Sequence, residues 1–211
     1  ARSAQGDELH QARLCQSLSV FTSSEIAFNS LCDLLKSDSQ AVRREILYGL
    51  AQFRSFPVAK VMIEHMKTAD QDDASTIVGA VAKYKFPGMQ QVLASSFLHP
   101  SGPVRARSYQ VVAQLGLRTM KDEVWEAFQK ENSTIAKLSA AQALSLLQDP
   151  RVLPSIRTWI KSTVSEERVM AVRMLGQWNS HQDGILLLRE LVDDPEVGKI
   201  ARLQLSRSQV M

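Results

Sequence analysis

The residues of this chain best suited to acid–base or metal chemistry are four histidines, His10, His65, His99 and His181. No two of them stand three or four residues apart, the spacing that places two imidazoles on one helix face, and no His-Glu dipeptide occurs. The sequence also has no glycine-rich phosphate loop and no nucleophile elbow. We therefore predict a protein that is not an enzyme, with no catalytic residue, no metal and no cofactor.

The acidic pairs and the cysteines have structural interpretations. Asp72-Asp73 and Asp193-Asp194 each stand before a predicted helix, where carboxylates accept hydrogen bonds from free N–H groups, so we interpret both as helix caps. We interpret Glu64-His65 as a solvated pair. Cys15 and Cys32 lie on neighbouring predicted helices and are either two free thiols or a disulfide, which would imply an oxidising compartment.

A row of glutamines and cations is the feature that points most directly to binding. Nine places are predicted to face outward on one layer of helices, and six of them hold glutamine. A primary amide has donors and an acceptor, so a regular row of amides can bond the backbone of an extended chain. The alternative is that glutamine is a good helix former that faces solvent. The candidate partner-binding residues are Arg44, Tyr48, Gln52, Lys83, Arg107, Gln110, Gln114, Gln142, Arg173 and Gln177.

The elements that must position these residues repeat with a period of about 31 residues, which is in the range of stacked helical repeats. In a twelve-residue frame that begins at Val42, apolar residues recur at the first, eighth or ninth, and twelfth places. A fixed period of this size indicates stacked helix pairs, so we expect a single repeat domain over residues 1–211. The ninth place of successive units is Leu18, Leu50, Val81, Val112, Leu144, Leu175 and Leu205.

Each unit is predicted to contain two amphipathic helices, because apolar residues recur at three- and four-residue spacings between short breaks. Asp149-Pro150 is a helix-start signal, and the short connections imply antiparallel neighbours. Trp125, Trp159 and Trp178 fall at apolar places and are predicted core residues. The helices are expected near 8–21, 24–36, 40–53, 57–67, 72–84, 87–98, 102–116, 119–130, 133–147, 151–162, 165–178, 182–192 and 195–207.

The stretch from Ala136 to Pro154 resembles the short HEAT-like repeat of the phycobilisome-lyase type. That family has a Val-Arg pair at the start of the inner helix, an Ala-Leu-Gly run at its end and Asp-Pro at the next start; Val42-Arg43, Val104-Arg105 and Leu175-Gly176 match. The resemblance implies an all-α fold, a right-handed α-solenoid of about six and a half antiparallel helix pairs. Its inner helices would line a concave face, where partners of such arrays usually lie.

The second place of the frame holds Arg43, Arg105, Lys137 and Arg168. In arrays that this chain resembles, such a column pairs with turn carboxylates such as Asp38 and forms a ladder between repeats. One departure from the pattern is Gly79, inside a predicted helix, where glycine costs about 1 kcal/mol relative to alanine. We expect its unit to be the softest in the stack.

The expected function is a non-enzymatic scaffold that binds a protein or peptide on the concave face. One alternative is a chromophore lyase or chaperone-lyase, as in some relatives of the family that the chain resembles. Another is weak binding of a nucleic-acid backbone through Arg44, Lys83, Arg107 and Arg173. The net charge of only +3 and the 6% aromatic content make nucleic acid the less favoured partner.

Compartment and assembly are less constrained by the sequence. No apolar run approaches the roughly 20 residues that span a bilayer, so we expect a soluble protein, either cytoplasmic or a processed exported domain. The last helix, near 195–207, carries Leu203 and is followed by Val210-Met211. We expect its apolar edge to be covered by more of a parent chain, by a partner or by a second copy.

Overall fold

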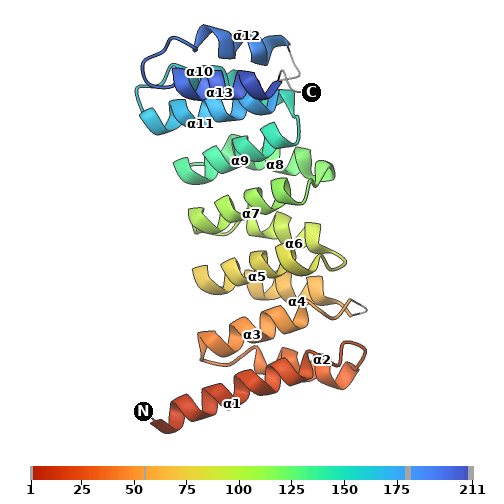
Figure 1. Cartoon of the computed structure of the whole chain (residues 1–211). Helices are drawn as coiled ribbons and strands as arrows, with labels where there is room; N and C mark the ends of the chain where they lie inside the picture. Colours follow the sequence, from red (N-terminus) through yellow and green to blue (C-terminus); the bar gives the residue numbers. More distant parts are fainter. Residues whose placement is uncertain (1, 55, 179–181, 209–211) are drawn as a thin grey trace. The chain divides into compact units, whose positions relative to one another are not determined.

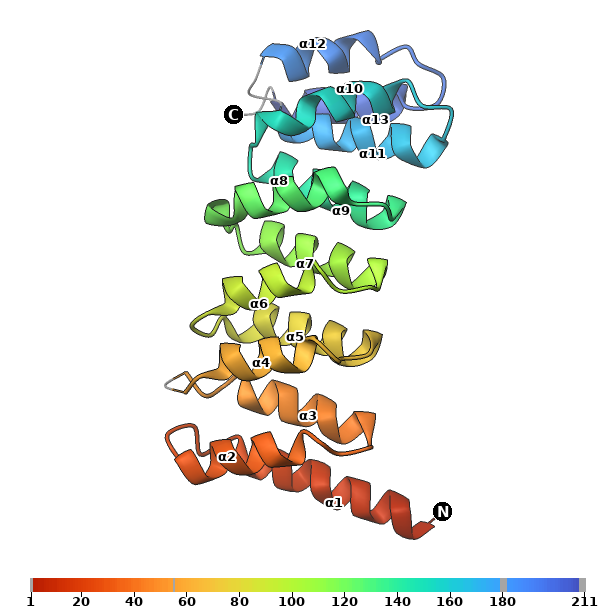
Figure 2. The ribbon, with the colours of Figure 1, turned by 180° about the vertical axis from the view of Figure 1, so that it is seen from behind.

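The computed structural model describes residues 2–54, 56–178 and 182–208, and all the regular secondary structure in these ranges is helical (Figures 1 and 2). The prediction of an all-α fold is confirmed. The chain divides into two compact units, Ala1–Val111, here the N-terminal unit, and Val112–Met211, the C-terminal unit. The expectation of a single domain over 1–211 stays a prediction.

The N-terminal unit is built from antiparallel helices in two layers. Helices α1, α3 and α5 pack side by side in one layer, whereas α4 packs on α6, and α2 lies against α1 and α3 (Figure 1). Its elements are α1 (Arg2–Leu18), α2 (Glu25–Leu34), α3 (Gln40–Leu50), α4 (Val58–Met66), α5 (Gln71–Tyr84), α6 (Met89–Ser96) and the first part of α7 (Gly102–Gln114).

The C-terminal unit has the same two-layer plan. Helix α11 packs between α9 and α13, while α8, α10 and α12 each pack on the α9, α11 or α13 helix that follows them (Figure 2). Its elements are the end of α7, the 3₁₀ turn η1 (Arg118–Met120), α8 (Lys121–Lys130), α9 (Thr134–Leu146), η2 (Pro150–Val152), α10 (Leu153–Ile160), α11 (Ser165–Leu175), η3 (Gly176–Trp178), α12 (Gln182–Glu190) and α13 (Gly198–Ser208).

The repeat frame identifies the core of both units. The ninth-place residues from Leu50 to Leu175 have no exposed surface, whereas the terminal members Leu18 and Leu205 are half-buried because a neighbour covers only part of each. Trp178 is buried as predicted. Trp125 and Trp159 are only half-buried, so their assignment to the core was too strong.

Capping chemistry sets the helix starts, with one correction. Asp149 accepts from the Arg151 N–H and precedes Pro150 at the first position of η2, and Asp194 accepts from the N–H groups of Glu196 and Val197. At the start of α5, however, the cap is Asp70, whose carboxylate accepts from the N–H groups of residues 72 and 73 at 3.0 and 2.8 Å. Asp73 is therefore not the cap of α5, and its carboxylate pairs instead with Arg43 and His65.

The remaining expectations concern the cysteines, the membrane and the chain end. Cys15 and Cys32 are free thiols, and burial raises the pKa of both. Within the described ranges, no helix combines the length and apolar character needed to cross a bilayer. Leu203 on α13 is about half exposed, at 51%. Residues 210 and 211 lie outside the described part.

Candidate functional site

A cavity of about 380 Å³ lies on the layer formed by α9, α11 and α13 in the C-terminal unit. Three of the candidate binding residues, Gln142, Arg173 and Gln177, contribute to its wall, and Gln204 and Arg207 from α13 complete the polar part. Apolar side chains provide the rest of the lining: Met170, Met174, Ile200 and Leu203. The structure thus brings together, from three helices, residues that the repeat predicted to share one face.

The polar lining has a definite electrostatic character. Among the residues that the structure describes, it includes two guanidinium groups and three amides but no carboxylate. A guanidinium presents a planar fork of donors that matches a carboxylate, and an amide can bond either an N–H or a C=O group. The cavity can therefore hold an anionic or backbone-like group next to an apolar one.

Gln204 was not among the predicted binding residues, although the repeat period points to it. Gln142, Arg173 and Gln204 follow one another at intervals of one repeat period, so Gln204 is the next member of the same column. Its side chain is largely buried against Gly176, where an added Cβ would overlap the Gln204 Oε1 atom. Glycine at 176 thus makes room for the amide at the cavity wall.

The same column has a different character in the N-terminal unit. Gly79 lies one repeat period after Tyr48, and a Cβ there would come 2.8 Å from the Tyr48 hydroxyl oxygen and 3.6 Å from an Arg107 guanidinium nitrogen. The missing side chain of Gly79 provides the space that the Tyr48 side chain uses. The helix-weakening glycine is thereby explained by packing; whether its unit is the softest stays a prediction.

Lys83 joins this cluster through aromatic contacts. Its ammonium lies 4.9 Å from the Tyr84 ring centroid and 5.6 Å from that of Tyr48. A hydrogen bond with Tyr84 raises the pKa of Lys83, with smaller contributions from Tyr48 and Glu45. The structure thus places the Lys83 ammonium beside the Tyr48 ring, and the Tyr48 hydroxyl and the Arg107 guanidinium both lie near Gly79, so part of this group is already engaged by its own neighbours.

The other candidate residues are more dispersed. Arg44 is exposed and lies 3.8 Å from the Glu45 carboxylate, while Gln52 lies beyond the end of α3 and donates to the Tyr48 carbonyl at 3.5 Å. Gln110 and Gln114 are exposed on α7. None of these four residues lines the cavity on α9, α11 and α13.

Two of the histidines, His65 and His99, contribute to packing and turns. The interpretation of Glu64-His65 as a solvated pair was wrong for His65: its Nε2 lies 2.9 Å from the buried Asp73 carboxylate, while Glu64 pairs with Lys67. His99 Nε2 lies 3.2 Å from the Ala69 carbonyl. His181 is outside the described residues. The described part of the chain contains no group of three or more potential metal ligands.

The expected arginine ladder exists, but with different partners. Arg43 reaches the buried Asp73 carboxylate at 2.6 Å and Asp70 at 3.4 Å, both in the following helix pair. Arg43 was expected to pair with the Asp38 carboxylate, but its guanidinium donates a hydrogen bond to the backbone carbonyl of Asp38. In the C-terminal unit, Arg168 similarly pairs with Asp194 and Glu196. We call each such Arg–carboxylate link a rung.

No protein-family model and no curated protein matches this sequence. Among solved structures, the chain is similar to a crystal structure described only as an engineered protein. The TM-score is 0.52 at 17% identity, and the alignment covers 87% of this chain and 96% of the other. This similarity concerns the fold alone.

Proposed function

We propose that the protein is a non-enzymatic scaffold that binds a protein or peptide on the surface formed by α9, α11 and α13. In this proposal the helix pairs belong to a right-handed HEAT-like solenoid of about six and a half pairs, as the repeat period and the family resemblance suggest. The observation that carries the binding proposal is the 380 Å³ cavity, whose described lining holds two guanidinium groups, three amides and no carboxylate.

The chemistry of this cavity favours an acidic peptide with an apolar side chain. Arg173 and Arg207 supply positive charge, and a carboxylate held between arginines makes short, charge-assisted hydrogen bonds. Met170, which is half-buried, offers a flexible thioether side chain that adapts to different apolar groups. Gln142 and Gln177 can bond the peptide backbone without regard to its sequence.

Selection from a library of random peptides displayed on phage, followed by affinity measurement, tests the proposal. We expect selected peptides to be enriched in Asp or Glu next to an apolar residue. Arg173→Glu should weaken their binding at least tenfold, because it places a negative charge in the cavity that repels the acidic side chain of the peptide. Arg189→Glu is the matched control, since Arg189 is an exposed arginine on α12 that does not line the cavity.

Two results would contradict the proposal. One is that no peptide is selected; the other is that selected peptides bind the Arg173→Glu variant as they bind the unmodified protein. The nucleic-acid alternative makes a separate prediction. It requires binding of a single-stranded oligonucleotide that falls steeply with salt concentration and weakens with each Arg or Lys removed.

A further inference from the structure

The second place of the repeat frame changes chemistry at Lys137. Arg43 and Arg168 each form a rung with carboxylates that stand nearly one repeat period later in the sequence. Glu167 follows Lys137 at the same sequence interval at which Asp73 follows Arg43. Among the described residues, however, Glu167 has the Ser162 hydroxyl as its hydrogen-bond partner, at 2.6 Å, and no basic group pairs with it.

Lysine does not reproduce the arginine link at this place, because its single ammonium lacks the planar fork by which a guanidinium bonds several acceptors at once. The Lys137 side chain instead directs its ammonium toward the Phe128 ring, 5.7 Å from the centroid. The rung that Arg43 forms in the N-terminal unit is therefore open at Lys137.

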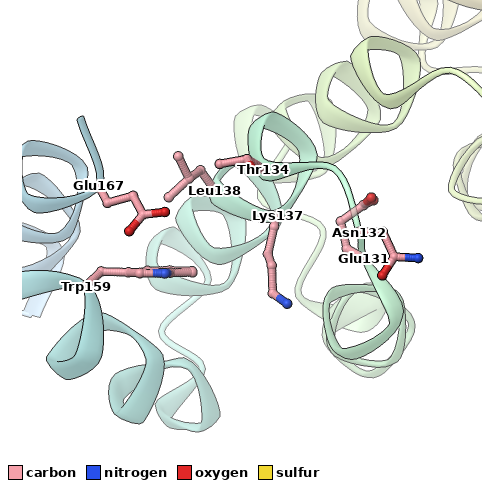
Figure 3. A pocket seen from close by; sticks show the side chains of 7 residues that line it. All are labelled: Glu131, Asn132, Thr134, Lys137, Leu138, Trp159 and Glu167. Atoms are coloured by element: carbon pink, nitrogen blue, oxygen red, sulfur yellow. The ribbon is translucent and has the colours of Figure 1, made fainter. Parts of the chain in front are cut away.

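A cavity of about 300 Å³ occupies the place of the open rung. In Figure 3, Glu167 and Trp159 lie on one side of it, and Lys137, Asn132 and Glu131 lie on the other. Thr134 and Leu138 complete the lining. The cavity is confined to the C-terminal unit and is separate from the one on α9, α11 and α13, since the two share no residue.

The charges of the lining favour a cation. Glu167 supplies a carboxylate that pairs with no basic group among the described residues, whereas Glu131, the other acid of the lining, is buried and accepts a hydrogen bond from the Ser133 N–H at 2.9 Å. Glu167 is half-buried, where attraction to a cation is less screened than on the open surface. An entering guanidinium would find in Glu167 the carboxylate that corresponds to Asp73 in the closed rung.

Trp159 adds a second feature that suits a guanidinium. Its ring is half-buried and packs edge-on to Phe128, with the centroids 6.2 Å apart, so the indole is held in place while part of it remains accessible. A guanidinium stacks on an indole face more favourably than most other side-chain cations. The same kind of contact occurs at Arg151, whose guanidinium carbon lies 5.4 Å from the Trp125 ring centroid.

We propose that this cavity binds the side chain of an arginine supplied by a partner protein, which completes the open rung by pairing with Glu167 and stacking on Trp159. The site does not depend on the binding surface proposed above. It requires a guanidinium rather than an acidic group.

The test follows the Trp159 indole N–H resonance by NMR during titration with Nα-acetylarginine amide. We expect a saturable shift that is absent with Nα-acetylcitrulline amide, which has the same shape without the charge. Glu167→Gln should weaken binding at least tenfold. Lys137→Arg should abolish it because the chain's own guanidinium then occupies the cavity, whereas Lys161→Arg, at an exposed lysine outside the lining, should have no effect.

The proposal is overturned by the absence of a saturable shift in the unmodified protein. It is also overturned if the citrulline compound binds equally well, or if Lys137→Arg leaves the affinity unchanged. Tighter binding of free arginine than of the capped compound would indicate a small-molecule site and overturn the assignment to a partner's side chain. Unchanged denaturation midpoints in the variants would show that altered binding is not a folding defect.

Discussion

Positions 43 and 137 hold the same place in the repeat, one in each unit, and they are used differently. Arg43 is 16% exposed and closes its rung on Asp73, which is 5% exposed. Lys137 turns toward Phe128 and leaves a cavity beside Glu167. We infer from the difference that lysine at this place of the repeat leaves the link unformed and a cavity beside it.

The column that begins at Tyr48 shows the same contrast. In the N-terminal unit, Gly79 lacks a side chain and the Tyr48 hydroxyl takes the space, close to Arg107. In the C-terminal unit, Gln142, Arg173 and Gln204 all retain side chains, which together line a cavity. We infer that the column is filled internally at Tyr48 and Gly79 in the first unit, whereas its members in the second unit are available for binding.

The comparison requires that both units share one packing frame, and the largest expected effects test this. Leu50→Ala and Leu144→Ala should each lower the free energy of unfolding by about 2–5 kcal/mol, because both side chains are fully buried. Leu146→Ala, at a leucine that is 41% exposed, is the control and should cost much less. Chemical denaturation measures all three; a loss below about 1 kcal/mol at Leu50 or Leu144 would contradict the frame.

Removal of the side chain at the second place of the frame should lower the free energy of unfolding more at the closed rung than at the open one. Arg43→Ala leaves the buried Asp73 carboxylate with His65 as its remaining side-chain partner, and we expect a loss of about 3 kcal/mol. Lys137→Ala breaks no ion pair and should cost less than about 1 kcal/mol. Equal losses of unfolding free energy in urea denaturation would mean that Arg43 and Lys137 stabilise the fold to the same extent.

These results bear on what the sequence could predict. The period placed Leu50, Val81, Val112, Leu144 and Leu175 in the core, because burial of one helix face is a local consequence of the apolar pattern. The partner of Arg43 was not predictable in the same way. Asp38 is closer in sequence, but Asp70 caps the next helix and leaves Asp73 buried within reach of the guanidinium.

The candidate site was predictable in part for a related reason. The period brought Gln142 and Arg173 into one column, and its extension by one further period would have included Gln204. The apolar lining from Met170 and Leu203 depends on how α11 and α13 pack, which periodicity does not specify. The cavity at Lys137 depends on the direction of one side chain, and no sequence pattern encodes that.

The unfolding free energy of the C-terminal unit should fall in acid because two of its carboxylates become protonated. A hydrogen bond from Arg151 holds the pKa of Asp149 below its ordinary value, and backbone N–H groups lower the pKa of Asp194. A carboxylate with a depressed folded-state pKa stabilises the fold above its unfolded pKa of about 4, and that contribution is lost as the pH falls through the folded value. Asp149→Asn should therefore reduce the pH dependence of the unfolding free energy below about pH 4. An unchanged dependence between about pH 4 and pH 2 would contradict this.

The smallest expected effect concerns the ends of two helices in the N-terminal unit. The residue that caps the C-terminus of α5 is Lys85, with φ at 48°, a conformation that suits glycine, whereas the corresponding residue after α4 is Lys67, with φ at −64°. Lys85→Gly should raise the unfolding free energy by about 0.5–1 kcal/mol, and Lys67→Gly should lower it by a similar amount. Thermal unfolding of the two variants measures the difference; destabilisation by both would mean that Lys85 is not strained.

The coupling free energy between positions 137 and 167 tests the central claim most directly. It is measured by a double-mutant cycle that uses Lys137→Ala and Glu167→Ala, beside the matched cycle with Arg43→Ala and Asp73→Ala. We predict a coupling of about 1–3 kcal/mol between Arg43 and Asp73 and less than about 0.5 kcal/mol between Lys137 and Glu167. A coupling between Lys137 and Glu167 as large as that between Arg43 and Asp73 would show that the rung is already closed and would contradict the account.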